Sequence, residues 1–218
     1  MAGCNANYQF TFVDIGAEGR NSDGGIFRQS IIGKKFFNGQ FNVPPPSKIS
    51  DERPSIPYML VADAAFPMTN FLTKPYSSRS GISQENKVFN YRLSRARRCI
   101  ENAFGILASR FRIFRKPIKC SLETLDSIIK ACVCLHNFLI KNKRELYCPP
   151  NFNDTELPNG EVIPGQWRND NISLENFKSI SLGTNNYSNN AAEVRNILRD
   201  YFVNEGAVPF QWSRLNNW

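Results

Sequence analysis

The chain has 218 residues, a formal net charge of +8 and a pI of about 9.3, with 41% hydrophobic and 21% charged residues. This balance excludes a disordered chain and indicates a globular protein. The positive charge favours an anionic partner, with nucleic acid the first candidate, although solubility alone would also explain it.

The cysteines and the hydropathy of the chain exclude several further classes of protein. The six cysteines contain no CxxC pair, and their wide spacing does not match a secreted disulfide scaffold. We therefore expect reduced thiols and no zinc site. Because the sequence shows no signal segment and no apolar run of membrane length, we expect a soluble, intracellular protein that does not contact membranes.

The first third of the chain predicts short strands and loops. Residues 8–15 predict a strand that runs into a turn, and the polar residues at 21–23 are typical of a helix start. The proline-rich segment 42–57 predicts a surface loop. The apolar run 58–62 predicts a buried strand that ends at Asp63.

A long helix is predicted from about residue 84 to residue 111. Its apolar residues recur at steps of three and four, which places them on one helical face: Phe89, Leu93, Ala96, Ile100, Phe104, Leu107 and Phe111. Glu101 and Arg97 fall beside this stripe, where the wall of a groove would lie. Arg92 and Arg110 point away from Glu101.

Two more helices are predicted in the second half of the chain, separated by a segment without periodicity. Residues 124–139 and 191–203 each carry an apolar helical stripe. Residues 141–190 are rich in Asn, Pro and Ser and predict a long, loop-rich arm. We therefore divide the chain into a domain at 1–140, the arm at 141–190, and a terminal helix and tail at 191–218.

Three carboxylates are candidates for metal binding: Asp23, Asp63 and Glu101. Carboxylate oxygens are preferred ligands of Mg²⁺ and similar hard cations, and pairs of such ions promote phosphodiester cleavage. Each residue also has a structural alternative. Asp23 could cap a helix, Asp63 could be a turn residue, and Glu101 could pair with Arg97 four positions earlier.

Arginines concentrate on and just after the long helix. The guanidinium group offers a planar fork of donors that suits DNA phosphates, and the alternative is a solvated basic face. The arginines expected to bind nucleic acid are Arg95, Arg97, Arg98 and Arg112.

The sequence offers little for other kinds of catalysis. Its single histidine, His136, lies in an apolar helix, where a structural role is the better interpretation. No GxSxG motif supplies a nucleophilic serine. Neither a Walker loop, GxGxxG nor HExxH is present.

Four segments resemble the catalytic half of Harbinger-type (PIF/Harbinger) transposases and the domesticated nuclease derived from them. The resemblance covers roughly residues 8–140, with a weaker similarity at 193–212. The segments occur in the order of the family: FTFVDIGAEGRNSDGGIFRQS, YMLVADAAFP, FNYRLSRARRCIENAFGILASRFRIFRKPI and CVCLHNFLI.

This resemblance implies an RNase H-like α/β domain, a mixed sheet flanked by helices that is incomplete at its N-terminus. It implies a nuclease that hydrolyses DNA phosphodiester bonds with Mg²⁺ or Mn²⁺, in which Asp23, Asp63 and Glu101 match the later acidic positions. A nuclear location follows, with the cytoplasm as the alternative. DNA is the expected substrate.

Two departures from the family leave a second hypothesis open. The first family aspartate would precede the strand near Tyr8, and Ala108 stands where many members carry a lysine after the glutamate. We therefore expect weak cleavage, from a truncated product, a decayed element or a domesticated remnant. The alternative function is a non-catalytic DNA-binding or protein-interaction remnant. No helix-turn-helix region is evident, so a separate DNA-binding protein or a missing segment would supply target recognition.

Overall fold

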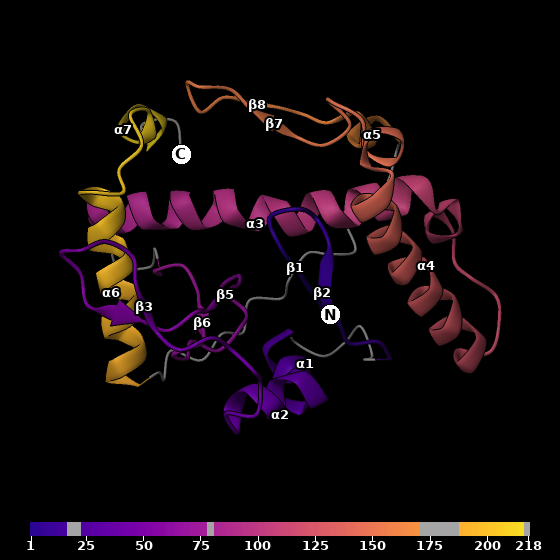
Figure 1. Ribbon diagram of the computed structural model, residues 1–218, viewed down its shortest axis with the longest axis horizontal. Helices are drawn as coiled ribbons and strands as arrows, with labels where there is room; N and C mark the ends of the chain where they lie inside the picture. The colour runs from indigo at the N-terminus through magenta and orange to yellow at the C-terminus, as the bar shows by residue number, and fades with distance from the viewer. Residues whose placement is uncertain (17–22, 78–80, 171–187, 216–218) are drawn as a thin grey trace. The chain divides into compact units, whose positions relative to one another are not determined.

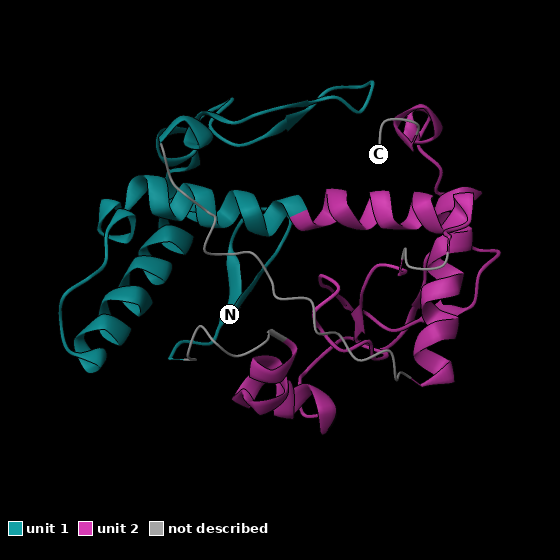
Figure 2. Ribbon diagram, turned by 180° about the vertical axis from the view of Figure 1, so that it is seen from behind, with its two compact units in different colours: residues 1–18, 98–178 teal, residues 19–97, 179–218 magenta. Residues whose placement is uncertain are grey.

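The computed structural model describes residues 1–16, 23–77, 81–170 and 188–215, without the side chain of Asp23. The chain divides into two compact units (Figure 2). Unit 1 comprises residues 1–18 and 98–178, and unit 2 comprises residues 19–97 and 179–218. The boundary between the two units falls within one long helix.

Helices make up most of the regular structure (Figure 1). They are α1 (Asp23–Gln29), α2 (Ile31–Phe37), α3 (Gln84–Arg110), α4 (Leu122–Asn142), α5 (Arg144–Tyr147), α6 (Asn189–Val203) and α7 (Gln211–Leu215), with the 3-10 helices η1 (Arg112–Arg115) and η2 (Gln166–Asp170). None of the described helices is long and apolar enough to cross a membrane.

The described strands are short and pair two by two. The antiparallel pairs are β1 (Ala2–Cys4) with β2 (Phe10–Val13), β3 (Ser47–Lys48) with β4 (Ser55–Ile56), and β7 (Thr155–Glu156) with β8 (Val162–Ile163). The parallel pair is β5 (Leu60–Val61) with β6 (Leu72–Thr73). Helices combined with small sheets are consistent with an α/β class, but the single mixed sheet expected from the sequence is not seen among these strands.

Helical periodicity predicted the long helices correctly. Helix α3 begins at the predicted residue and ends at Arg110, one residue before the predicted end. Its stripe is only partly buried: Phe89, Leu93 and Leu107 are buried, whereas Ala96 is exposed. Helix α4 also agrees, and it begins at the residue after Ser121, whose side chain accepts a hydrogen bond from the Thr124 N–H.

In unit 1, the hairpin of β1 and β2 is tied to α4 by two adjacent side chains. The Asn137 amide accepts a hydrogen bond from the Phe10 N–H and donates one to the Phe10 carbonyl, both at 2.8 Å. His136 is fully buried, and its Nε2–H donates to the Tyr8 carbonyl while its Nδ1 accepts from the Tyr147 hydroxyl. The structural interpretation of His136 is therefore confirmed.

The segment after residue 140 contributes to the core of unit 1, although its composition predicts a loop-rich arm. Tyr147, Phe152 and Trp167 are buried and pack in one cluster with Ile106 of α3. No periodic pattern is visible in this segment because single aromatic residues alternate with turns. Residues 171–187 of the predicted arm lie outside the described residues.

The sequence predicted that the apolar run before Asp63 is a buried strand. In unit 2 of the structure this prediction is wrong. Only Leu60 and Val61 form β5, and the side chains of Tyr58 and Val61 are 50% and 41% exposed. The buried strand of this sheet is β6, whose Leu72 and Thr73 are both buried. A run of two residues is too short for hydrophobic alternation to identify.

Candidate functional site

Asp63 lies just beyond β5, at the carboxyl end of the parallel pair in unit 2. Its Oδ1 accepts a hydrogen bond from the Ala65 N–H at 2.9 Å, which closes a local turn. The side chain is half-buried, and its other oxygen makes no hydrogen bond to the described residues. Asp63 therefore has the turn role that the sequence offered as an alternative, and it keeps one oxygen for another ligand.

A buried lysine, Lys74, follows β6 at the same edge of this sheet. Lys74 is 5% exposed, and its Nζ donates a hydrogen bond to the Ala64 carbonyl at 3.3 Å. Burial lowers the pKa of Lys74 and Arg195 lowers it further, whereas the Asp63 carboxylate opposes this shift. Sequence reasoning missed Lys74, since its nearness to Asp63 depends on the parallel pairing of β5 with β6.

Glu101 projects from α3 in unit 1 and is paired with a residue far along the chain. Its Oε2 lies 3.9 Å from a terminal nitrogen of Arg168, and its side chain is 44% exposed. The partner is therefore Arg168 and not Arg97, the partner considered from the sequence. This separation is too long for a hydrogen bond from Arg168, and no other described residue donates to the carboxylate, so it can accept another ligand.

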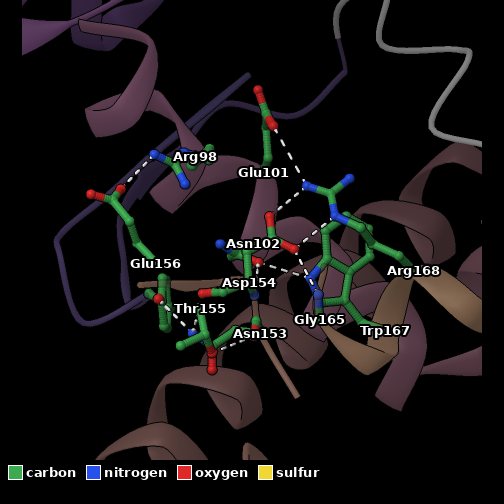
Figure 3. A network of polar contacts seen from close by, with 11 residues as sticks. Arg98, Glu101, Asn102, Asn153, Asp154, Thr155, Glu156, Gly165, Trp167 and Arg168 are labelled. Carbon is green, nitrogen blue, oxygen red and sulfur yellow. Dashed lines mark hydrogen bonds and ion pairs between the residues drawn. The ribbon is translucent and has the colours of Figure 1, made fainter. Parts of the chain in front are cut away.

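The residue after Glu101 fixes this turn of α3 in the core (Figure 3). The Asn102 side-chain oxygen accepts hydrogen bonds from the Trp167 indole N–H at 2.8 Å and from the Asp154 backbone N–H at 3.0 Å. Trp167 lies so close to Gly105 that a Cβ atom there would stand 2.3 Å from the indole. These buried contacts hold the backbone that carries Glu101.

The buried carboxylate of Asp154 and the partly exposed guanidinium of Arg168 form a two-pronged ion pair beside Glu101. Arg168 donates to the two carboxylate oxygens of Asp154 at 2.7 and 2.5 Å, and the Gly165 N–H donates to Asp154 at 2.9 Å. Burial alone would raise the pKa of Asp154, but these hydrogen bonds outweigh it and hold the pKa below its usual value. Asp154 is therefore an anion in the folded protein at neutral pH.

The arginines expected to bind nucleic acid differ in what they contact. The Arg95 guanidinium lies over the ring of Phe210, 5.2 Å from its centroid, and Arg98 pairs with Glu156 at 2.7 Å. Arg97 makes no ion pair within the part of the chain that the structure describes, and Arg112 is exposed. Arg97 and Arg112 are thus the two that keep their donors available.

The two arginines set aside in the sequence analysis have internal roles. Arg92 lies over Phe202 at 4.5 Å and donates to the Gly206 carbonyl, while Arg110 lies over Phe152 and donates to the Tyr147 carbonyl. Both belong to the packing of their own unit. The sequence analysis placed them on the side away from Glu101 but did not reveal these contacts, which come from segments distant in sequence.

The three predicted carboxylates are not gathered into one described cluster. Asp23 begins α1, but its side chain lies outside the described residues; Asp63 belongs to unit 2 and Glu101 to unit 1. Among the side chains that are described, no three His, Cys, Asp or Glu residues lie together as a metal site would require. The six thiols are free, and burial raises the pKa of Cys4 to about 12.

A comparison with known protein families shows to which family the chain belongs. A family model of DDE superfamily endonucleases matches residues 1–137, more than half of the 218 residues. The chain belongs to this family. No curated protein and no solved structure matches it significantly.

Membership in the DDE superfamily endonuclease family indicates a protein derived from a transposase-type nuclease. Asp63, Lys74 and Glu101 lie inside the matched region, whereas Asp154 and Arg168 lie beyond it. The Glu101 environment therefore combines a family helix with a later segment of this chain.

Proposed function

We propose that this chain is a Harbinger-type, transposase-derived endonuclease with RNase H-like ancestry that cleaves DNA with divalent metal ions. Asp23, Asp63 and Glu101 are its proposed acidic residues. Arg95, Arg97, Arg98 and Arg112 are its proposed contacts to the DNA backbone. The family match supports the reaction class, and the residue roles are our assignment.

The observation that carries this proposal is the state of Glu101. It is a half-exposed carboxylate on a basic helix, beside a fixed guanidinium, and it makes no hydrogen bond to the residues that the structure describes. Asp63 likewise keeps one oxygen available. Hard oxygen donors of this kind fit Mg²⁺ or Mn²⁺, which are the proposed cofactors.

The protein's own side chains supply binding and orientation. Divalent ions would make a water nucleophilic and stabilise the leaving oxygen. The turn at Asp63 fixes one carboxylate through the Ala65 N–H, and Asn102 fixes the backbone beside the other. The exposed guanidinium of Arg112 and that of Arg97 are suited to backbone phosphates, which positions DNA without reading its sequence.

A plasmid-nicking assay with Mg²⁺ or Mn²⁺ tests the proposal. We expect metal-dependent nicking, weak in absolute rate, that Asp63→Ala and Glu101→Ala both abolish. Asp126→Ala is the matched control, since it removes a carboxylate from an exposed ion pair with Lys130. Nicking that survives either test substitution would refute the assigned roles.

A second function, DNA binding without cleavage, is favoured by one specific observation. Arg97 and Arg112 keep their donors available whether or not a metal site forms. Binding that weakens steeply with salt but never leads to nicking would support this alternative. Both proposed functions include a separate DNA-binding partner protein and a nuclear location. Co-purification of this chain with such a partner and DNA would test the partner.

A further inference from the structure

A guanidinium is fixed beside Glu101 by groups that are themselves out of solvent. The Asp154 side chain is 2% exposed and holds Arg168 by two hydrogen bonds. The guanidinium also lies 4.3 Å from the centroid of the Trp167 ring. Because the pairing and the stacking restrain it from two directions, Arg168 is ordered before any ligand arrives.

Part of this guanidinium remains available for a ligand. Arginine has five N–H donors, and Asp154 takes two of them. Figure 3 shows the other terminal nitrogen pointing away from Asp154 and from Glu101. The Arg168 side chain is 37% exposed, and Glu101 at 3.9 Å is too far for a hydrogen bond.

From this geometry we propose that Arg168 binds a phosphate of the DNA backbone beside Glu101. The inference rests on the proposed nuclease function and adds to it a binding residue outside the region that the family model matches. Phosphate suits this position because the free terminal nitrogen of the guanidinium offers a charge-assisted hydrogen bond to an anionic oxygen.

The competing explanation is that Arg168 serves only to neutralise Asp154 within the core. The two explanations differ in the dependence of DNA binding on salt. An arginine that contacts a phosphate releases a counterion on binding, so its loss lowers the log–log salt slope by about one. A purely internal arginine leaves that slope unchanged.

The test measures the fluorescence anisotropy of a labelled DNA duplex with EDTA present, so that no cleavage occurs. The test protein is the full chain with Asp154→Asn and Arg168→Gln together, which avoids leaving a buried charge unpaired. The control is Asp170→Asn with Arg115→Gln, which removes the 2.7 Å ion pair between Arg115 and Asp170. Both variants change the same charges within unit 1.

We expect the test variant to bind DNA about tenfold more weakly at low salt, as for one charge-assisted hydrogen bond, with a salt slope smaller by about one. The control variant should keep the wild-type slope. Equal salt slopes in the test and control variants would overturn the proposed role of Arg168 but would leave the nuclease proposal standing. A wild-type chain that binds no DNA even at low salt would overturn the nuclease proposal as well.

A single substitution, Arg168→Lys, keeps the proposal testable if the double variant does not fold. Lysine keeps the positive charge opposite Asp154 but loses the fork of donors. We expect weaker DNA binding with a nearly unchanged slope, and a thermal unfolding transition that shows the variant to be folded. Wild-type affinity in a folded Arg168→Lys protein would contradict the proposal.

Discussion

Glu101 and Asp63, the two proposed acidic residues whose side chains are described, are held in opposite ways. Glu101 stands on a long helix whose next residue, Asn102, is buried and accepts two hydrogen bonds from the segment 154–167. Asp63 follows a strand of two residues and is fixed mainly by its own turn. The first position depends on tertiary contacts and the second on local backbone, so they should respond differently to mutation.

The largest expected effect is at the ion pair beside Glu101. Asp154→Ala removes the buried carboxylate that Arg168 and the Gly165 N–H both contact. We expect a loss of about 3 kcal/mol in the free energy of unfolding, the lower end for one partner of a buried pair, because Arg168 keeps partial contact with water. Thermal unfolding measures this loss, with Asp126→Ala as the control on an exposed pair.

If Asp154→Ala instead unfolded like the wild type, the segment after residue 140 would not support Glu101. Glu101 and Asp63 would then both depend on local structure only. Glu101 would be held by its helix alone.

The next effect is expected where Trp167 approaches α3. Gly105→Ala places a Cβ atom where the indole now lies, at 2.3 Å, within a buried contact. We expect roughly 1–3 kcal/mol of destabilisation from this overpacking. Ala108→Gly on the same helix is the control, since its helix-propensity cost of about 1 kcal/mol comes without a clash. Wild-type stability of Gly105→Ala in thermal unfolding would contradict the contact between Gly105 and Trp167.

A smaller, pH-dependent effect should come from His136 in the same unit. Burial lowers the pKa of His136 below 6.5, with the hydrogen bond to the Tyr8 carbonyl opposing it. The unfolded chain therefore binds a proton more readily, so stability is full above about pH 6.5 and falls as the pH drops below it. Because His136 is the only histidine of the chain, His136→Gln should flatten this dependence. A variant with the wild-type slope would show that another group is responsible.

The contrast between the two positions also explains what the sequence could predict. Helical periodicity located the ends of α3, α4 and α6 to within three residues, and with them the placement of Glu101 on a basic helix. It did not reveal Arg168, since a contact between residues 101 and 168 depends on a return of the chain through Asp154 and Trp167.

Local composition predicted the structure least well where residues distant in sequence pair with one another. The run before Asp63 contains apolar residues, yet only two of them form a strand. The buried strand of this pair is β6. Lys74 became a neighbour of Asp63 only through the parallel register of Leu60 with Leu72. The segment 141–170 looked like a loop because its buried aromatics are not periodic.

The smallest expected effect on stability is at Asp63, and it is the sharpest test of the contrast with Asp154. Asp63→Asn keeps an oxygen that can accept the Ala65 N–H, so the turn persists while the charge is lost. We expect a change of no more than about 0.5 kcal/mol in the free energy of unfolding, as for an ordinary partly exposed site. The same variant should lose metal-dependent nicking, because a neutral amide is a weaker ligand for a hard cation than a carboxylate. A folded Asp63→Asn protein that nicks DNA as well as the wild type would remove Asp63 from the proposed site, and a strongly destabilised one would show that Lys74 relies on its charge.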